Sequence, residues 1–137
     1  MRTTFLLSCF TFFSLLSNGQ NPDIVKLRKE INQHPQQDEY RVNRLNKIAE
    51  IGNNILPDDE RMKLVDEALQ ISRSIKYSVG EGFALLNLAI TGRNRYTKEE
   101  RDNFIMQADS IAKKSGNKEL EGYVLLRIGL SKRFGNE

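Results

Sequence analysis

Few residues in this sequence could do chemistry, and none has the neighbours that catalysis requires. His34 is the single histidine, and it precedes Pro35 in a segment typical of a loop. Metal sites and catalytic triads need several convergent side chains, so we interpret His34 as a solvated residue. The sequence has no Gly-rich phosphate loop, no Cys/His cluster and no serine in a nucleophile elbow. We therefore predict that the protein is not an enzyme and uses no metal or other cofactor.

The acidic runs are better explained by helix starts than by a metal site. Residues 58–60 are consecutive acids, and Glu99 and Glu100 follow Thr97 closely. Carboxylates are favoured in the first turn of a helix because they oppose its dipole, and threonine is a good N-terminal cap. Three consecutive acids also lack the alternating spacing of a calcium loop. We predict that a helix begins at each of these runs.

Residues 1–19 have the order of a secretory signal peptide. Arg2 precedes an apolar run from Phe5 to Leu16, and the small residues Ser17 and Gly19 follow. Such an order is typical of a signal, and the run is shorter than the roughly 20 residues that span a bilayer. We expect cleavage after Gly19 and export to the periplasm or cell envelope, with an uncleaved N-terminal anchor as the alternative.

The remainder, residues 20–137, would depend on packing alone. Cys9 is the only cysteine and lies in the predicted signal, so no disulfide could form in the remainder. The formal net charge of the whole chain is +3. This charge is too small and too evenly spread to indicate a nucleic-acid partner, and beyond the signal nothing indicates a membrane.

Residues 20–137 repeat at an interval of 40 residues. Segment 81–89 (EGFALLNLA) aligns with segment 121–129 (EGYVLLRIG), and other apolar positions obey the same shift. These are the pairs Ala68/Ala108, Ile71/Ile111, Val65/Ile105, Leu45/Leu85, Ile48/Leu88 and Ala49/Ala89. Each interval holds two apolar stripes at helical spacing, separated by turn-forming residues. We therefore predict an all-α protein with helices over approximately 23–33, 38–53, 58–75, 80–94, 97–115 and 118–134.

The repeat pattern resembles the tetratricopeptide repeat family. Leu85, Leu88 and Ala89 match its first helix, and Val65 and Ala68 match its second. The interval exceeds the usual length of about 34 residues and resembles an extended subclass. The match is degenerate where Gly52 and Gly92 replace an aromatic residue and where Arg61 and Arg101 replace a small one. The resemblance implies a right-handed α-α superhelix of stacked helix pairs.

The order of a signal, a short helix and repeats also resembles the N-terminal sensor region of Bacteroidetes-type two-component histidine kinases. In those proteins a transmembrane helix and a kinase follow the repeats, and this sequence contains neither. Two alternatives stay open: a stand-alone repeat protein that takes part in signal sensing, or the sensor portion of a longer histidine kinase.

The family resemblance implies that the first helices of successive pairs line a groove for a protein or peptide. Amides would bond the peptide backbone, rings would hold apolar anchors and arginines would take carboxylates. The predicted peptide-binding residues are Asn43, Asn46, Phe83, Arg93, Tyr123 and Arg133. The aliphatic residues Leu86, Ile90 and Leu126 could equally be core between repeats. The last helix, 118–134, offers a stripe of Val124, Leu125 and Ile128 that would be exposed, so homo-oligomerisation through it is a further hypothesis.

Overall fold

The computed structural model describes residues 21–134, so the predicted signal peptide over residues 1–19 lies outside the described residues. Residues 21–134 form six α-helices and one short 3-10 helix, with no strand among them. The elements are α1 (Pro22–Gln33), α2 (Glu39–Ile51), α3 (Asp58–Ser74), α4 (Ser78–Thr91), η1 (Gly92–Asn94), α5 (Lys98–Ser115) and α6 (Lys118–Phe134). The prediction of six helices is therefore confirmed, and the observed bounds lie close to the predicted ones.

Local sequence accounts for several helix ends. Thr97 and Glu100 form a capping box at the start of α5: the Glu100 backbone N–H donates to Thr97 Oγ1 at 3.2 Å, and the Thr97 backbone N–H donates to Glu100 Oε2 at 2.7 Å. Asp38 caps α2 by accepting from the backbone N–H of Arg41 at 3.1 Å. Gly116 ends α5 with a φ of +66°, a conformation that glycine adopts without strain.

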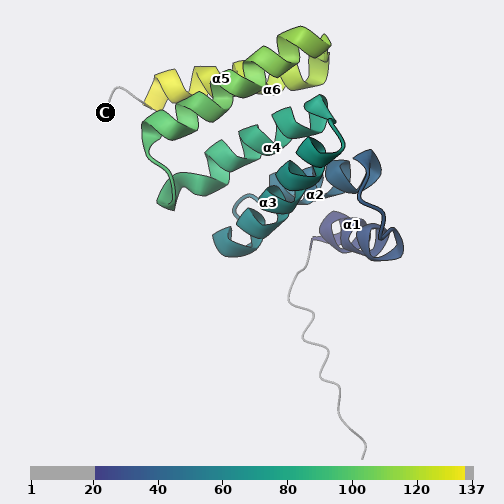
Figure 1. The fold of residues 1–137 in the computed structure, drawn as a ribbon. Coiled ribbons are helices and arrows are strands. Elements are labelled where there is room, and N and C mark those ends of the chain that lie inside the picture. The colour runs from purple at the N-terminus through teal and green to yellow at the C-terminus, as the bar shows by residue number, and fades with distance from the viewer. Residues whose placement is uncertain (1–20, 135–137) are drawn as a thin grey trace, which may run out of the picture.

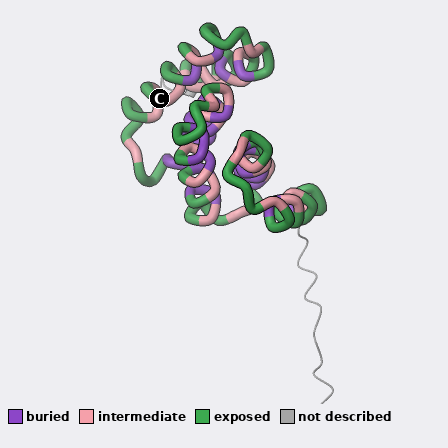
Figure 2. Tube along the Cα trace, turned by 45° about the vertical axis from the view of Figure 1, so that its right-hand side comes forward, coloured by how far each residue is buried: buried purple, intermediate pink, exposed green. Residues whose placement is uncertain are grey.

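The helices stack in chain order, with α1 at one end and the pair α5 and α6 at the other (Figure 1). Each helix packs against the next, and α4 also contacts both α2 and α6. Buried residues accordingly run along α4 at the centre of the stack, as Figure 2 shows. The apolar stripes predicted from the repeat are buried in α2, α3 and α4, where Leu45, Val65 and Leu85 are at most 1 % exposed.

The prediction that Val124 belongs to an exposed stripe is wrong. Val124 is completely buried and packs in one cluster with Leu120 of the same helix and Ala108 and Ala112 of α5. The spacing of Leu120, Val124 and Ile128 places these residues on one face of α6, and that face meets α4 and α5. The exposed apolar residues of α6 are instead Leu125 and Leu126, which are 61 % and 55 % exposed.

Candidate functional site

A groove of about 270 Å³ lies along α2, α4 and α6, the first helices of three successive pairs, and we call it the central groove. Four of the six predicted binding residues line it: Asn43, Asn46, Phe83 and Tyr123. Its other lining residues include Lys47, Glu50, Tyr77, Leu86, Asn87, Ile90, Glu119 and Arg127. Leu86 and Leu126 were two of the aliphatic residues that could belong either to the groove or to the core between repeats. Leu86 is buried in the core, and Leu126 is exposed outside this groove.

The amide groups of the groove differ in whether they are available to a ligand. Asn46 is buried, and its Nδ2 donates to the carbonyl oxygen of Gly80 at 3.0 Å. The Nδ2 of Asn87 in turn donates to the carbonyl oxygen of Asn46 at 3.1 Å, so the two amides join α2 to α4. Asn43 is exposed and accepts from the Tyr77 hydroxyl at 3.1 Å. Asn46 therefore holds the groove together, whereas Asn43 can exchange its partner for a ligand.

Sequence analysis did not identify Asn87, a buried residue of α4 that lines the groove. The signal was present, because Asn87 is the one amide in the apolar run from Phe83 to Ile90. A buried polar side chain in such a run needs a hydrogen-bond partner. The structure supplies that partner from the neighbouring helix α2.

A hydrogen bond between α6 and α2 crosses the central groove. The Tyr123 hydroxyl donates to Glu50 Oε1 at 2.7 Å, and Lys47 Nζ donates to Glu50 Oε2 at 2.9 Å. The hydrogen bond to Glu50, together with burial, raises the pKa of Tyr123. The ring of Tyr123 also packs edge-to-face against Phe83, with centroids 5.8 Å apart. The groove thus contains an aromatic pair beside a charged bridge.

A second cavity of about 610 Å³ adjoins the groove where η1, the start of α5 and the second half of α6 meet, and we call it the basic cavity. It shares Ile90 and Arg127 with the central groove. Its cationic lining residues are Arg93, Lys98, Arg101 and Arg127. Arg93, which was expected in the peptide groove, therefore lies beside it. Arg133 is exposed near the end of α6 and lines neither cavity.

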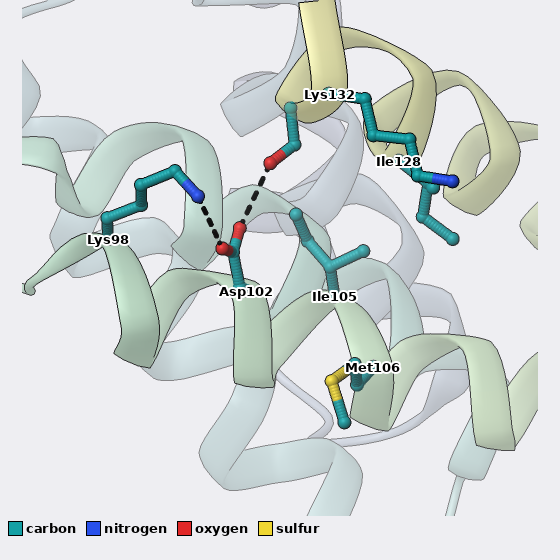
Figure 3. A pocket seen from close by; sticks show the side chains of 7 residues that line it. Lys98, Asp102, Ile105, Met106, Ile128 and Lys132 are labelled. Atoms are coloured by element: carbon teal, nitrogen blue, oxygen red, sulfur yellow. Dashed lines mark hydrogen bonds and ion pairs between the residues drawn. The ribbon is translucent and has the colours of Figure 1, made fainter. Parts of the chain in front are cut away.

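Asp102 lines the basic cavity and also a neighbouring cavity between α5 and α6, and Figure 3 shows it from the side of that second cavity. Its carboxylate accepts from Lys98 Nζ at 2.9 Å and from Ser131 Oγ at 3.1 Å. The hydrogen bond from Lys98 is the main cause that lowers the pKa of Asp102. Asp102 is therefore ionised at neutral pH and already bonded to two side chains.

Arg61 is a buried cation that the sequence pattern did not reveal. Only 2 % of its surface is exposed, and its Nε donates to the carbonyl oxygen of Ala49 at 3.1 Å. Asp58 lies 3.6 Å from Nη1, and Nη2 has no hydrogen-bond partner among the described residues. Burial lowers the pKa of Arg61, and the positive charges of Arg127 and Arg93 lower it further. Asp58 opposes this effect by favouring the charged form of Arg61, and Glu50 does the same for Arg127.

The loop between α1 and α2 holds His34 against two neighbours. Its Nε2 lies 2.7 Å from Asp38 Oδ2, and its ring centroid lies 4.6 Å from that of Tyr40.

Within residues 21–134, no three His, Cys, Asp or Glu side chains converge as a metal site would require. No helix in that range has the length and apolar character needed to cross a membrane.

These observations define the described chain as an all-α, helical-repeat-like structure with a groove across its first helices. Comparison with protein-family models, with curated proteins and with solved structures finds no match to the sequence or the fold.

Proposed function

We propose that this protein is an exported, tetratricopeptide-like repeat scaffold that binds a protein or peptide segment in the central groove. The helix pairs α2–α3 and α4–α5, followed by α6, would form a right-handed superhelix. The observation that carries the proposal is the convergence of α2, α4 and α6 on one groove, because this is the arrangement that the repeat resemblance implies. Export rests on the signal-like order of residues 1–19.

The lining of the groove suits an extended peptide. The rings of Phe83 and Tyr123 offer a partly buried apolar surface, on which an aromatic or aliphatic side chain would pack. Asn43 offers an exposed amide that can bond a peptide backbone. In a sensor that resembles those of histidine kinases, such binding would be the sensing step, whether the kinase lies on this chain or on another.

The proposal is tested by selecting peptides from a random displayed library on the exported chain. Binding is then measured for the variant Tyr123→Ala, which removes a ring from the groove. The matched control is Tyr40→Ala, which removes the same residue type from α2 outside the groove. Circular dichroism confirms that both variants fold. Loss of binding in the groove variant alone supports the proposal, whereas equal binding by both variants, or no selected peptide, contradicts it.

A second candidate function is self-association through α5 and α6. Met106 is 68 % exposed, and together with Ile128 it lines a cavity of about 370 Å³ between these helices (Figure 3). Leu125 is 61 % exposed, whereas Leu85, its equivalent 40 residues earlier, is 1 % exposed because the next helices cover it. Leu125 is therefore an exposed apolar side chain at a repeat position that is buried in the preceding repeat. Such a side chain offers a contact surface for a second copy of the chain.

Light scattering over a range of protein concentrations tests self-association. A dimer that Leu125→Glu with Leu126→Glu dissociates would support it. A strict monomer at every concentration would rule it out.

A further inference from the structure

A cavity of about 700 Å³ lies between α1 and the loop that joins α2 to α3, and we call it the α1 cavity. Its apolar wall is formed by Ile24, Val25, Ile55 and Leu56. Val25 is 46 % exposed and Ile55 is 49 % exposed, whereas Ile24 and Leu56 belong to the core that α1 shares with α2 and α3. The α1 cavity has no lining residue in common with the central groove or the basic cavity, so it is a separate site.

The 40-residue repeat explains why Val25 is exposed. Its equivalent in α3, Val65, is completely buried and lies in one cluster with Ala49 of the preceding helix α2. Among residues 21–134 no helix precedes α1, which lies at the end of the stack (Figure 1). The described part of the chain therefore leaves open a face of α1 that is covered in the following repeat.

The side chain next to this face decides which kind of occupant fits. Ala68 of α3 and Ala108 of α5 are completely buried, and small residues of this kind let neighbouring helices pack closely. Arg28 occupies the equivalent position in α1, and its guanidinium group donates to the carboxylate of Glu60 in α3. A helix with its side chains is about 10–12 Å wide and would have to displace this ion pair. An extended hydrocarbon chain is thinner and can lie beside it.

The rim of the α1 cavity carries a positive charge that no described residue neutralises. The ammonium group of Lys29 has no ion pair or hydrogen bond within residues 21–134. Arg28 and Glu60 balance each other, so the net charge of the lining residues is that of Lys29. The amides of Asn32 and Gln33 also line the cavity and offer further hydrogen-bond donors.

We propose that the α1 cavity binds a fatty acid, with the acyl chain on Val25, Ile55 and Leu56 and the carboxylate at Lys29. A volume of about 700 Å³ lies within the range of small-molecule sites, which is about 300–1,000 Å³. Burial of apolar surface supplies most of the affinity, because an ion pair at an exposed lysine contributes little in water. The charge of Lys29 instead selects an anionic head group over a cationic one.

Isothermal titration calorimetry on the exported chain tests the inference with two probes, decanoate and decyltrimethylammonium. The probes have the same chain length and opposite charges, and both are used below the concentrations at which they form micelles. The test variant is Val25→Ser with Ile55→Ser, which removes the exposed part of the apolar wall. The control variant is Ile75→Ser with Leu125→Ser, which removes exposed aliphatic side chains outside the cavity. Circular dichroism checks that both variants fold.

The expected result is that decanoate binds and decyltrimethylammonium binds more weakly. The test variant should weaken decanoate binding by about tenfold or more, because two apolar contacts are lost, and the control variant should retain the affinity. Lys29→Gln should weaken decanoate binding by about twofold to fivefold and should remove the preference over decyltrimethylammonium. In NMR spectra, decanoate should shift the amide signals of α1 and Ile55.

The inference would be overturned if decanoate did not bind, if both probes bound equally, or if both double variants weakened binding equally. Decanoate binding that weakens as the protein concentration rises would also overturn it, because a second copy would then cover the cavity. Tyr123→Ala should leave decanoate binding unchanged, since Tyr123 lines the central groove and not the α1 cavity. The fatty-acid site and the peptide groove can therefore fail independently of each other.

Discussion

Two glycines at equivalent places in the repeat give a sharp test of the packing. Gly82 in α4 and Gly122 in α6 are 40 residues apart, and each is the fifth residue of its helix. A Cβ atom at Gly82 would lie 2.5 Å from Leu120 Cδ2 and 3.3 Å from Ile111 Cγ2. A Cβ atom at Gly122 would have no neighbour within 4 Å. The same substitution therefore meets a packed neighbour at one position and open space at the other.

The expected magnitudes follow from two effects. Alanine in place of glycine inside a helix stabilises it by about 0.5–1 kcal/mol, and both positions receive this gain. At Gly82 the new methyl group must displace Leu120, which is completely buried, and overpacking of this kind costs about 1–3 kcal/mol. Gly122→Ala should therefore raise the free energy of unfolding by about 0.5–1 kcal/mol. Gly82→Ala should be less stable than Gly122→Ala by about 1–3 kcal/mol.

Urea denaturation followed by far-ultraviolet circular dichroism measures both variants against the original chain. Unchanged m values would show that the midpoints report stability alone. If Gly82→Ala proved as stable as Gly122→Ala, Leu120 would not pack on Gly82, and the contact of α6 with α4 would be refuted. If Gly122→Ala weakened a dimer instead of stabilising the monomer, a second copy would cover α6.

Three other predictions concern single side chains. Asn46→Ala should lower the free energy of unfolding by about 1–3 kcal/mol, because the buried carbonyl oxygen of Gly80 loses its donor. Urea denaturation measures this change. An unchanged free energy of unfolding would contradict the conclusion that Asn46 joins α2 to α4. Because the folded-state pKa of Tyr123 is raised, the stability from this residue is present below pH 10.0 and is lost as the pH rises above it. Glu50→Gln should lower that pKa in an NMR titration of labelled tyrosine, and an unchanged pKa would refute the assignment. Thr97→Ala should lower the melting temperature by removing a cap worth about 1 kcal/mol, and no change would mean that the cap does not form in solution.

The sequence predicts the helices well because their signals are local. The acids and threonine that begin α5 act within one turn, and Gly116 ends the helix through its own backbone. The repeat of 40 residues then relates helix to helix without any knowledge of contacts. For the same reason the groove residues Asn43, Phe83 and Tyr123 could be named in advance, since their positions within each repeat place them on the first helices.

The face of α6 that is buried could not be predicted from local sequence signals alone. Residues 124–126 are all apolar, so helical spacing alone fits more than one choice of buried face. Contact with α4 and α5 selects the face of Leu120 and Val124, and it leaves Leu125 exposed. Only the neighbouring helices could decide between these choices.

Hydrogen bonds between residues far apart in the chain could likewise not be predicted from the sequence. The hydrogen bond from Tyr123 to Glu50 joins residues in different repeats, and the one from Asn87 to Asn46 links two first helices. The positive charge around Arg61, Arg93 and Arg127 comes from three separate elements, α3, η1 and α6. The sequence by itself therefore determined the helices and their repeat register, which depend on neighbours within a few residues. Tertiary structure alone decided which side chains are buried, which are bonded to each other and where the charges meet, because those depend on distances between separate helices.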